Sequence, residues 1–96
     1  MNKEKILEFL RNDIQNLRQD FGVESIGLFG SYSKGLQTDD SDIDFLVKLK
    51  PPYASNFFGL WNYLEKKLNK KIDLTREGAH LRSNFMNTVN KEIVYA

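Results

Sequence analysis

Two motifs decide how this chain folds: GSYSKG at residues 30–35 and DID at residues 42–44. The hydrophobic run Val23 to Phe29 leads into the first motif, and a second run, Ile43 to Leu49, begins inside the other. Each run has the length and apolar character of a strand, and the glycine ends the first one. The sequence therefore predicts strands over 23–29 and 42–49, joined by one helical turn at 31–34 and a polar loop at 36–41.

Helical periodicity predicts three longer helices around these strands. Apolar residues recur at helical spacing in three segments: residues 3–20, 54–69 and 79–91. Pro51-Pro52 ends the second strand, because proline continues neither a ladder nor a helix interior. Residues 71–75 are predicted as a short third strand, and the tail from Glu92 to Ala96 has no clear pattern.

The order helix, strand, turn, strand, helix, strand, helix predicts an α/β (α+β) fold in which helices pack on a small mixed β-sheet. About a dozen residues join the first two strands, which is short for a parallel crossover and favours an antiparallel pair. A length of 96 residues suits one small domain, so we expect a single domain over 1–96.

The composition excludes several classes of protein. The net charge of +1 gives no general attraction to nucleic acid or membranes. The chain has no cysteine, hence neither a disulfide nor a thiolate metal site. No apolar run approaches the roughly 18 residues of a membrane span, and the N-terminus lacks a signal-peptide core. A cytoplasmic protein that makes no membrane contact is the expectation.

The Asp-x-Asp motif suggests a metal site. On a strand, Asp42 and Asp44 would share one face, and like charges so close raise one another's pKa unless a cation intervenes. Carboxylates suit Mg²⁺, which binds one or two of them together with substrate phosphates. The alternative is an acidic loop or solvated face. A calcium-binding EF-hand loop starting at Asp40 does not fit, because Phe45 and Pro51 stand where glycine and glutamate are required.

The glycine-serine turn suggests a phosphate site. At the end of a strand, Gly30 and Gly35 let backbone N–H groups approach phosphate oxygens, while Ser31 adds a donor and Lys34 a positive charge. A P-loop is excluded, because Leu36-Gln37 follows where Lys-Ser/Thr is required. The alternative for both glycines is ordinary turn chemistry.

Asp73 is the third candidate ligand, because an aspartate between two apolar strand residues is unusual. If the third strand neighbours the second, Asp73 joins Asp42 and Asp44. Three carboxylates around two metal ions about 3.5–4 Å apart serve in-line phosphoryl or nucleotidyl transfer. The alternative is an exposed strand acid near Lys70 and Lys71.

Taken together, Gly30-Ser31, Gly35, the Asp-x-Asp motif and a later lone Asp73 resemble the DNA polymerase beta-type nucleotidyltransferase superfamily. The short length points to the minimal nucleotidyltransferase branch of this superfamily, and the chain resembles the antitoxins of HEPN/MNT toxin–antitoxin pairs. The resemblance covers nearly the whole chain. The family loop usually reads Gly-Ser-x-Ala-Arg-Gly, and this chain has Ser33-Lys34 in place of Ala-Arg. Lysine keeps the charge but loses the bidentate fork of arginine.

The resemblance implies a complete reaction. Asp42 and Asp44 would hold two Mg²⁺ ions, with Mn²⁺ as an alternative, and Asp73 would complete the site and accept a proton. Gly30, Ser31, Lys34 and Gly35 would bind the phosphates of ATP. AMP would pass to a hydroxyl, in this branch a tyrosine of the HEPN toxin, a ribonuclease that AMP would block.

Two other functions stay open: neutralisation of the toxin by contact alone, and transfer to a small molecule as in aminoglycoside nucleotidyltransferases. Oligomeric state is not predicted. Several further residues have weaker interpretations. His80 is expected at the surface or at a helix start, and Phe58 or Tyr63 is a candidate for a partner interface. Three residues that follow the last acid are candidates for the lining of the active-site pocket, with a solvated face as the alternative: Arg76, Glu77 and Arg82.

Overall fold

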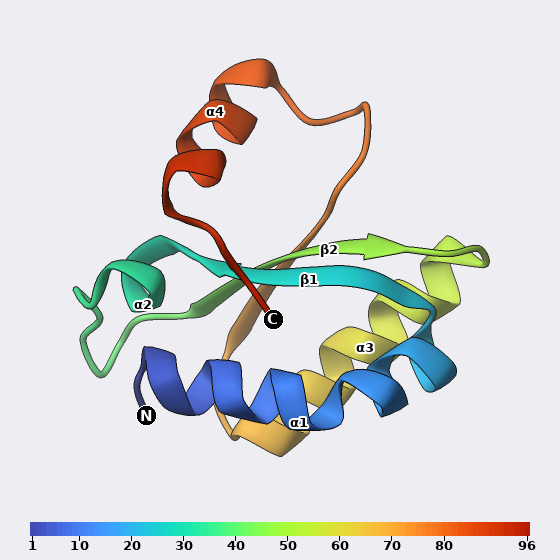
Figure 1. Ribbon diagram of the computed structural model, residues 1–96, viewed down its shortest axis with the longest axis horizontal. Helices are drawn as coiled ribbons and strands as arrows, with labels where there is room; N and C mark the ends of the chain where they lie inside the picture. Colours follow the sequence, from blue (N-terminus) through green and yellow to red (C-terminus); the bar gives the residue numbers. More distant parts are fainter.

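The computed structural model describes residues 1–96, in which helices pack against both faces of one four-stranded sheet (Figure 1). The strands lie in the order β3-β2-β1-β4. The elements, in chain order, are α1 Lys3–Phe21, β1 Val23–Phe29, α2 Gly30–Lys34, β2 Ile43–Leu49, α3 Tyr53–Leu68, β3 Ile72–Arg76, α4 Ser83–Glu92 and β4 Val94–Tyr95. None of the helices combines the length and apolar character needed to cross a membrane.

The sheet is mixed, as the sequence predicts. β1 and β2 pair antiparallel, so the short connection between them does join antiparallel strands. β2 and β3 pair parallel, with α3 as the crossover between them. The C-terminal end of β1 therefore lies beside the N-terminal ends of β2 and β3. This end of the sheet brings together the glycine-serine turn and the acidic residues.

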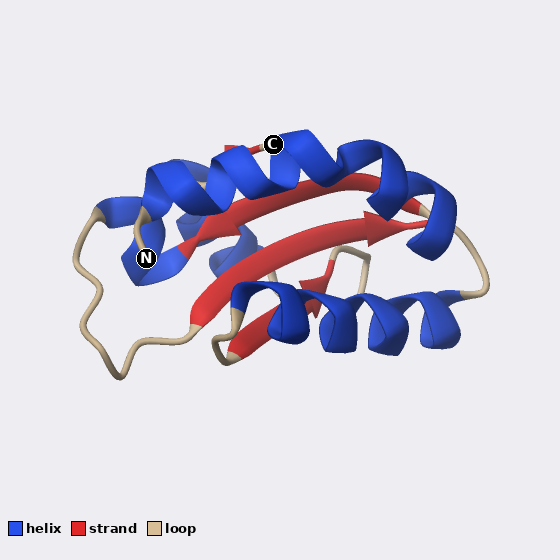
Figure 2. Cartoon of the chain, turned by 90° about the horizontal axis from the view of Figure 1, so that it is seen from below, coloured by secondary structure: helices blue, strands red, loops and turns tan.

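Helices α1 and α3 cover one face of the sheet, and α4 lies on the other (Figure 1). Figure 2 shows α1 and α3 side by side along the covered face. The main hydrophobic core lies between these two helices and the sheet, and its residues on β2 alternate along the strand: Ile43, Phe45, Val47 and Leu49. A smaller cluster of Phe29, Leu46 and Val89 holds α4 against the opposite face.

Local sequence explains where α1 begins and ends. The Asn2 side chain caps the N-terminus by accepting a hydrogen bond from the Lys5 amide at 2.9 Å. Gly22 ends the helix in the left-handed conformation, with φ at 63°, and its amide bonds back into the last turn. A hydrogen bond of 2.6 Å from Tyr63 to Asp13 then ties α3 to α1.

The structure corrects the predicted C-terminal region. The helix predicted from residue 79 begins at Ser83, because residues 78–82 form a turn in which the Leu81 amide bonds to the Gly78 carbonyl at 3.2 Å. The unassigned tail forms β4, whose Val94 and Tyr95 pair with the edge of β1. Apolar periodicity cannot find a two-residue strand, because its pairing depends on a distant partner.

The two aromatic residues considered for a partner interface differ. Tyr63 is half-buried and uses its hydroxyl inside the chain, on Asp13. Phe58 is 62% exposed, although its ring meets Phe57 edge-on at 5.3 Å between centroids. Phe58 is therefore the residue of the pair whose side chain is available at the surface.

Candidate active site

Asp44 and Asp73 lie next to each other at one end of the sheet. They are the second residues of β2 and β3, and they are register partners in the parallel ladder. Each lies between residues whose side chains enter the main core, so both carboxylates belong to the opposite face, where α4 lies. The third strand thus neighbours the second, which is the condition under which Asp73 joins the Asp-x-Asp motif.

Asp42 completes the acidic group from just outside the sheet. The predicted strand starts at Asp42, whereas β2 starts at Ile43, so Asp42 ends the preceding loop. Its side chain is half-buried, and its charge reaches Asp44. The three acids therefore have three environments: a loop end, a partly buried strand position and, at Asp73, an exposed edge strand.

The electrostatics of the group centre on Asp44. The pKa of Asp44 is raised from its ordinary 3.8 to about 6, chiefly by burial and then by the negative charges of Asp73 and Asp42. A cation beside Asp44 would offset both effects. Oxygen donors of this kind fit Mg²⁺ or Mn²⁺. The side chains, as they lie, do not close into a ready group of three ligands.

Gly30 lies directly against the Asp44 carboxylate. Its φ of 76° is in the left-handed region, which favours glycine. A Cβ atom at this position would overlap the Asp44 carboxylate and lie 3.0 Å from its Cγ atom. Both the backbone conformation and the space therefore require glycine here, which brings the predicted phosphate turn into contact with the predicted metal site.

The remainder of the turn forms the short helix α2. Ser31 is half-buried, and its carbonyl accepts a hydrogen bond from the Leu36 amide at 2.9 Å. Gly35 ends the helix with φ at 71°, and a Cβ there would meet nothing within 4 Å. The Gly35 position therefore requires glycine for its backbone conformation alone, which is the turn chemistry considered as its alternative.

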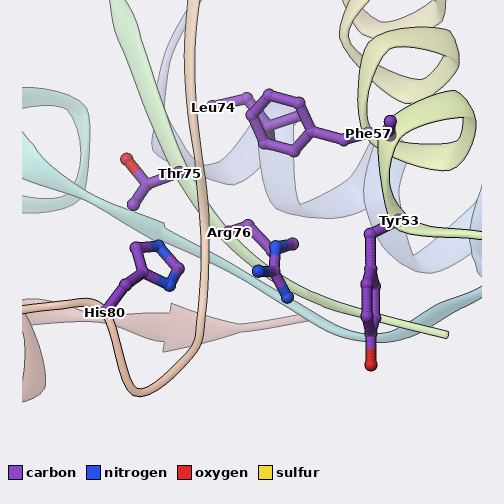
Figure 3. Close-up of a pocket in the computed structure, with 7 residues that line it drawn as sticks. Tyr53, Phe57, Leu74, Thr75, Arg76 and His80 are labelled. Atoms are coloured by element: carbon purple, nitrogen blue, oxygen red, sulfur yellow. The ribbon is translucent and has the colours of Figure 1, made fainter. Parts of the chain in front are cut away.

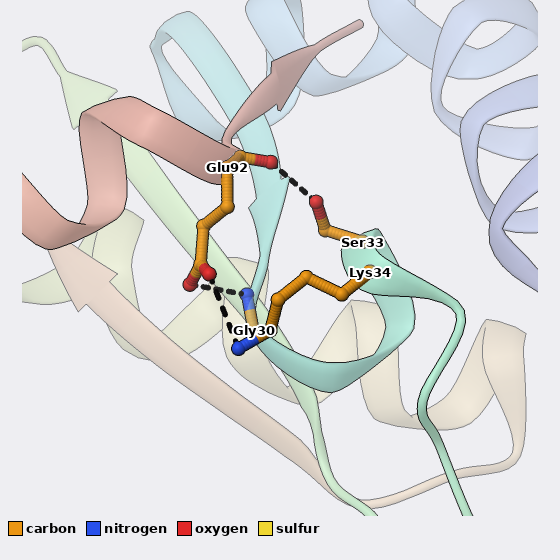
Figure 4. Close-up of polar contacts among 4 residues, drawn as sticks. All are labelled: Gly30, Ser33, Lys34 and Glu92. Atoms are coloured by element: carbon orange, nitrogen blue, oxygen red, sulfur yellow. Dashed lines mark hydrogen bonds and ion pairs between the residues drawn. The ribbon is translucent and has the colours of Figure 1, made fainter.

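A residue that the motifs do not reveal, Glu92, binds this turn (Figure 4). Its Oε1 atom accepts a hydrogen bond from the Gly30 amide at 3.1 Å, and its Oε2 atom lies 3.3 Å from the Lys34 ammonium. The Ser33 hydroxyl donates to the Glu92 backbone carbonyl. Ser33 and Lys34, the two departures from the family loop, thus both contact Glu92. Glu92 lies in the segment without a sequence pattern, so no local signal could have identified it.

A pocket of about 450 Å³ lies along the C-terminal part of β3 and the start of α3 (Figure 3). Arg76 stands over the Tyr53 ring at 4.5 Å from its centroid. Arg76 and the exposed His80 both line the pocket, whereas Asp42, Asp44 and Asp73 do not. Arg76 thus lines a pocket in which none of the three acids takes part, and its expected place in the lining of the active site stays a prediction.

The other two candidates for the pocket lining lie outside it. The Glu77 amide donates to the Val47 carbonyl at 2.8 Å, which extends the pairing of β3 with β2. Arg82 is the exposed residue that precedes α4. His80 lies in the turn before α4, at the surface as expected. None of these residues contributes a group to the end of the sheet where Gly30 meets Asp44.

Comparisons with known proteins agree on one family of relatives, the nucleotidyltransferases. A model of the nucleotidyltransferase domain matches residues 5–94. The chain is 40% identical over 93 residues to the protein adenylyltransferase MntA of Thermococcus cleftensis, covering 96% of this chain and 93% of the relative. Among solved structures, a toxin–antitoxin complex with AMP-PNP has a chain of 28% identity, with a TM-score of 0.69 over 88% of this chain and 69% of that chain.

A protein solved as a candidate minimal nucleotidyltransferase is similar over almost its whole length. It shares 25% identity and a TM-score of 0.79, over 98% of this chain and 95% of that chain. The mixed sheet with its packed helices therefore matches the minimal nucleotidyltransferase fold. The family match, the fold and the arrangement of acids behind a glycine-serine turn agree, and the chain belongs to the nucleotidyltransferase domain family.

Proposed function

We propose that this chain is a protein adenylyltransferase that moves AMP from ATP to a tyrosine hydroxyl of a HEPN-type toxin, and so acts as its antitoxin in the cytoplasm. The observation that carries the proposal is the register pair of Asp44 and Asp73, with Gly30 packed against Asp44. The similarity to an adenylyltransferase and to a toxin–antitoxin complex with an ATP analogue supports this choice of substrate and partner.

Asp42, Asp44 and Asp73 are the residues that would hold divalent cations. Asp44 is central, because the repulsion that raises its pKa is the effect that a bound cation removes. Two Mg²⁺ ions, or Mn²⁺ in their place, would neutralise the phosphates and make the acceptor hydroxyl easier to deprotonate. The half-buried and exposed acids would then form one ligand set.

Gly30, Ser31, Lys34 and Gly35 are the residues that would bind the β- and γ-phosphates. The Gly30 amide and the Lys34 ammonium already serve as donors to a carboxylate, which supports their capacity to bind an anion. Ser31 would add its hydroxyl. Holding the β- and γ-phosphates at the turn would leave the α-phosphorus on the side of the acids.

The reaction is a single displacement. The tyrosine oxygen attacks the α-phosphorus of ATP and forms a new P–O bond, and the bond from that phosphorus to the bridging oxygen breaks. Pyrophosphate leaves in line. The tyrosine proton passes to the carboxylate of Asp73, which is exposed on the edge strand and open to an incoming partner. AMP on the toxin then places a bulky anion at its RNA site.

Intact-mass spectrometry of a co-expressed HEPN-type partner tests this function. We expect AMP-sized increments on the partner with the natural chain and none with the Asp42→Asn/Asp44→Asn double variant. Tandem mass spectrometry should place the modification on tyrosine. An Asp39→Asn/Asp40→Asn variant is a matched control, because it removes two loop charges that are fully outside the sheet.

Removing metal ions from the purified reaction is a second test, because it measures whether AMP transfer depends on a divalent cation. Transfer should stop with a chelator and return with added Mg²⁺ or Mn²⁺. An unmodified partner that is still neutralised, and that co-purifies equally well with the double variant, would overturn the catalytic proposal. Neutralisation by contact alone would take its place.

A further inference from the structure

The carboxylate of Glu92 binds the donors that the proposed function assigns to phosphate. One of its oxygens accepts from the Gly30 amide at 3.1 Å, and the other pairs with Lys34 at 3.3 Å. Both oxygens are thus engaged at the turn, one with a backbone donor and one with a cation. This is the combination of donors that proteins use for phosphate oxygens.

The Gly30 amide cannot serve Glu92 and a phosphate at the same time. A backbone N–H group carries one hydrogen, so a second acceptor must displace the first. Lys34 has three donor hydrogens, but the Glu92 charge already neutralises its single positive charge. A triphosphate that approached this turn with Glu92 in place would meet its negative charge at close range, with Asp44 beside it.

The position of Glu92 is built into the fold. Glu92 ends α4, and its side chain is only 16% exposed, whereas that of Lys34 is 49% exposed. The Ser33 hydroxyl holds the Glu92 carbonyl, and the Ile93 amide bonds to the Val89 carbonyl at 2.9 Å. Pairing of β4 with β1 fixes the chain immediately beyond.

We propose that Glu92 is an internal competitor of the nucleotide: its carboxylate occupies the phosphate donors of Gly30 and Lys34 and must leave them before a triphosphate binds. The backbone contacts to Ser33 and β1 do not involve this carboxylate, so rotation of the side chain alone frees the turn. The inference rests on the proposed function, since it concerns the same phosphate site. Glu92 thereby sets the affinity for ATP without forming part of the ligand set.

Isothermal titration calorimetry with ATP and Mg²⁺ tests the proposal on three full-length chains. Glu92→Gln keeps the size of the side chain and removes its charge. We expect Glu92→Gln to bind ATP about tenfold more tightly than the natural chain, because no charge-assisted contact has to break first. Glu24→Gln is the matched control, since it removes a glutamate that lies 4.0 Å from Lys48 at the far end of β1, and its affinity should not change.

The direction of the change in ATP affinity distinguishes a Glu92 that competes with the nucleotide from one that supports nucleotide binding. If Glu92 instead positioned the turn for ATP, Glu92→Gln would bind more weakly, and this result would overturn the inference. A thermal melt without ATP should show the variant folded and slightly less stable, because it loses the ion pair with Lys34. Lower stability together with tighter binding is a combination that a purely structural role does not produce.

Assays of AMP transfer distinguish failure of this inference from failure of the proposed function. AMP transfer by the natural chain, with equal ATP affinity in Glu92→Gln, overturns the inference and leaves the function. Tighter binding in Glu92→Gln without transfer by either chain overturns the function and leaves the competition intact. Binding of ATP by neither chain overturns both.

Discussion

Asp44 and Asp73 face each other across the parallel pairing of β2 and β3, one partly buried and the other exposed. This pairing places two like charges on adjacent strands at the same level of the sheet. Directly opposite like charges destabilise a sheet. The fold thus holds an unfavourable arrangement at the position where the proposed function needs a cation, which is typical of sites that bind one.

Asp44→Asn should stabilise the metal-free protein. The pKa of Asp44 is about 6 in the folded protein, against an ordinary 3.8. The contribution of this group to stability is therefore fully present below pH 3.8 and is lost as the pH rises through the folded value. After discount for solvent screening, we expect the variant to gain about 1 kcal/mol of unfolding free energy at about pH 8, and almost nothing near pH 4. Urea unfolding in a chelator at both pH values measures this. A loss of stability at the higher pH would contradict the expectation.

Asp73→Asn should remove transfer while leaving the fold intact. Loss of the proton acceptor should lower the rate by at least about 100-fold, and the exposed position predicts little change in melting temperature. The same change should lower the pKa of Asp44, because a neighbouring negative charge is gone. Carboxyl NMR titration checks the shift. Asp40→Asn, in the preceding turn, is the control that should alter neither quantity.

Gly30→Ala should destabilise the chain more than Gly35→Ala. Both glycines have positive φ, at 76° and 71°, so alanine is strained at either position by about 1 kcal/mol. Only at Gly30 does the added carbon also collide with Asp44, whereas the space at Gly35 is open. We expect a total loss of about 2–3 kcal/mol at Gly30, measured by urea unfolding. Equal losses at both positions would mean that the close approach to Asp44 is absent.

Tyr63→Phe should weaken the contact between α1 and α3. The Tyr63 hydroxyl donates to the Asp13 carboxylate at 2.6 Å, and its loss should cost about 1 kcal/mol. The same bond raises the pKa of Tyr63 from 10.0 to about 12, so this stabilisation is present below the lower value and is lost as the pH rises through the higher one. Tyr95→Phe, at an exposed position, serves as the control in the same thermal unfolding series.

Local pattern was sufficient for most elements of the fold. The strands at 23–29 and 43–49 and the helices that begin at Lys3 and Tyr53 lie within about two residues of their predicted bounds, because each has a long apolar periodicity and a glycine or proline at its end. The helix after β3 begins at Ser83, four residues later than the apolar periodicity predicts. Its first turn lacks a capping side chain, so the sequence contains no start signal there.

The sequence by itself determined the kinds of groups in the site: a glycine-serine turn, an Asp-x-Asp motif and a lone strand aspartate, in an order typical of nucleotidyltransferases. Tertiary structure alone decided how these groups meet. The register of β2 and β3 sets Asp73 beside Asp44, and the left-handed Gly30 lies against the Asp44 carboxylate. The return of α4 across the sheet then brings Glu92 to Gly30, 62 residues earlier in the chain. Periodicity reports only near neighbours in sequence, and these contacts depend on the packing of distant segments.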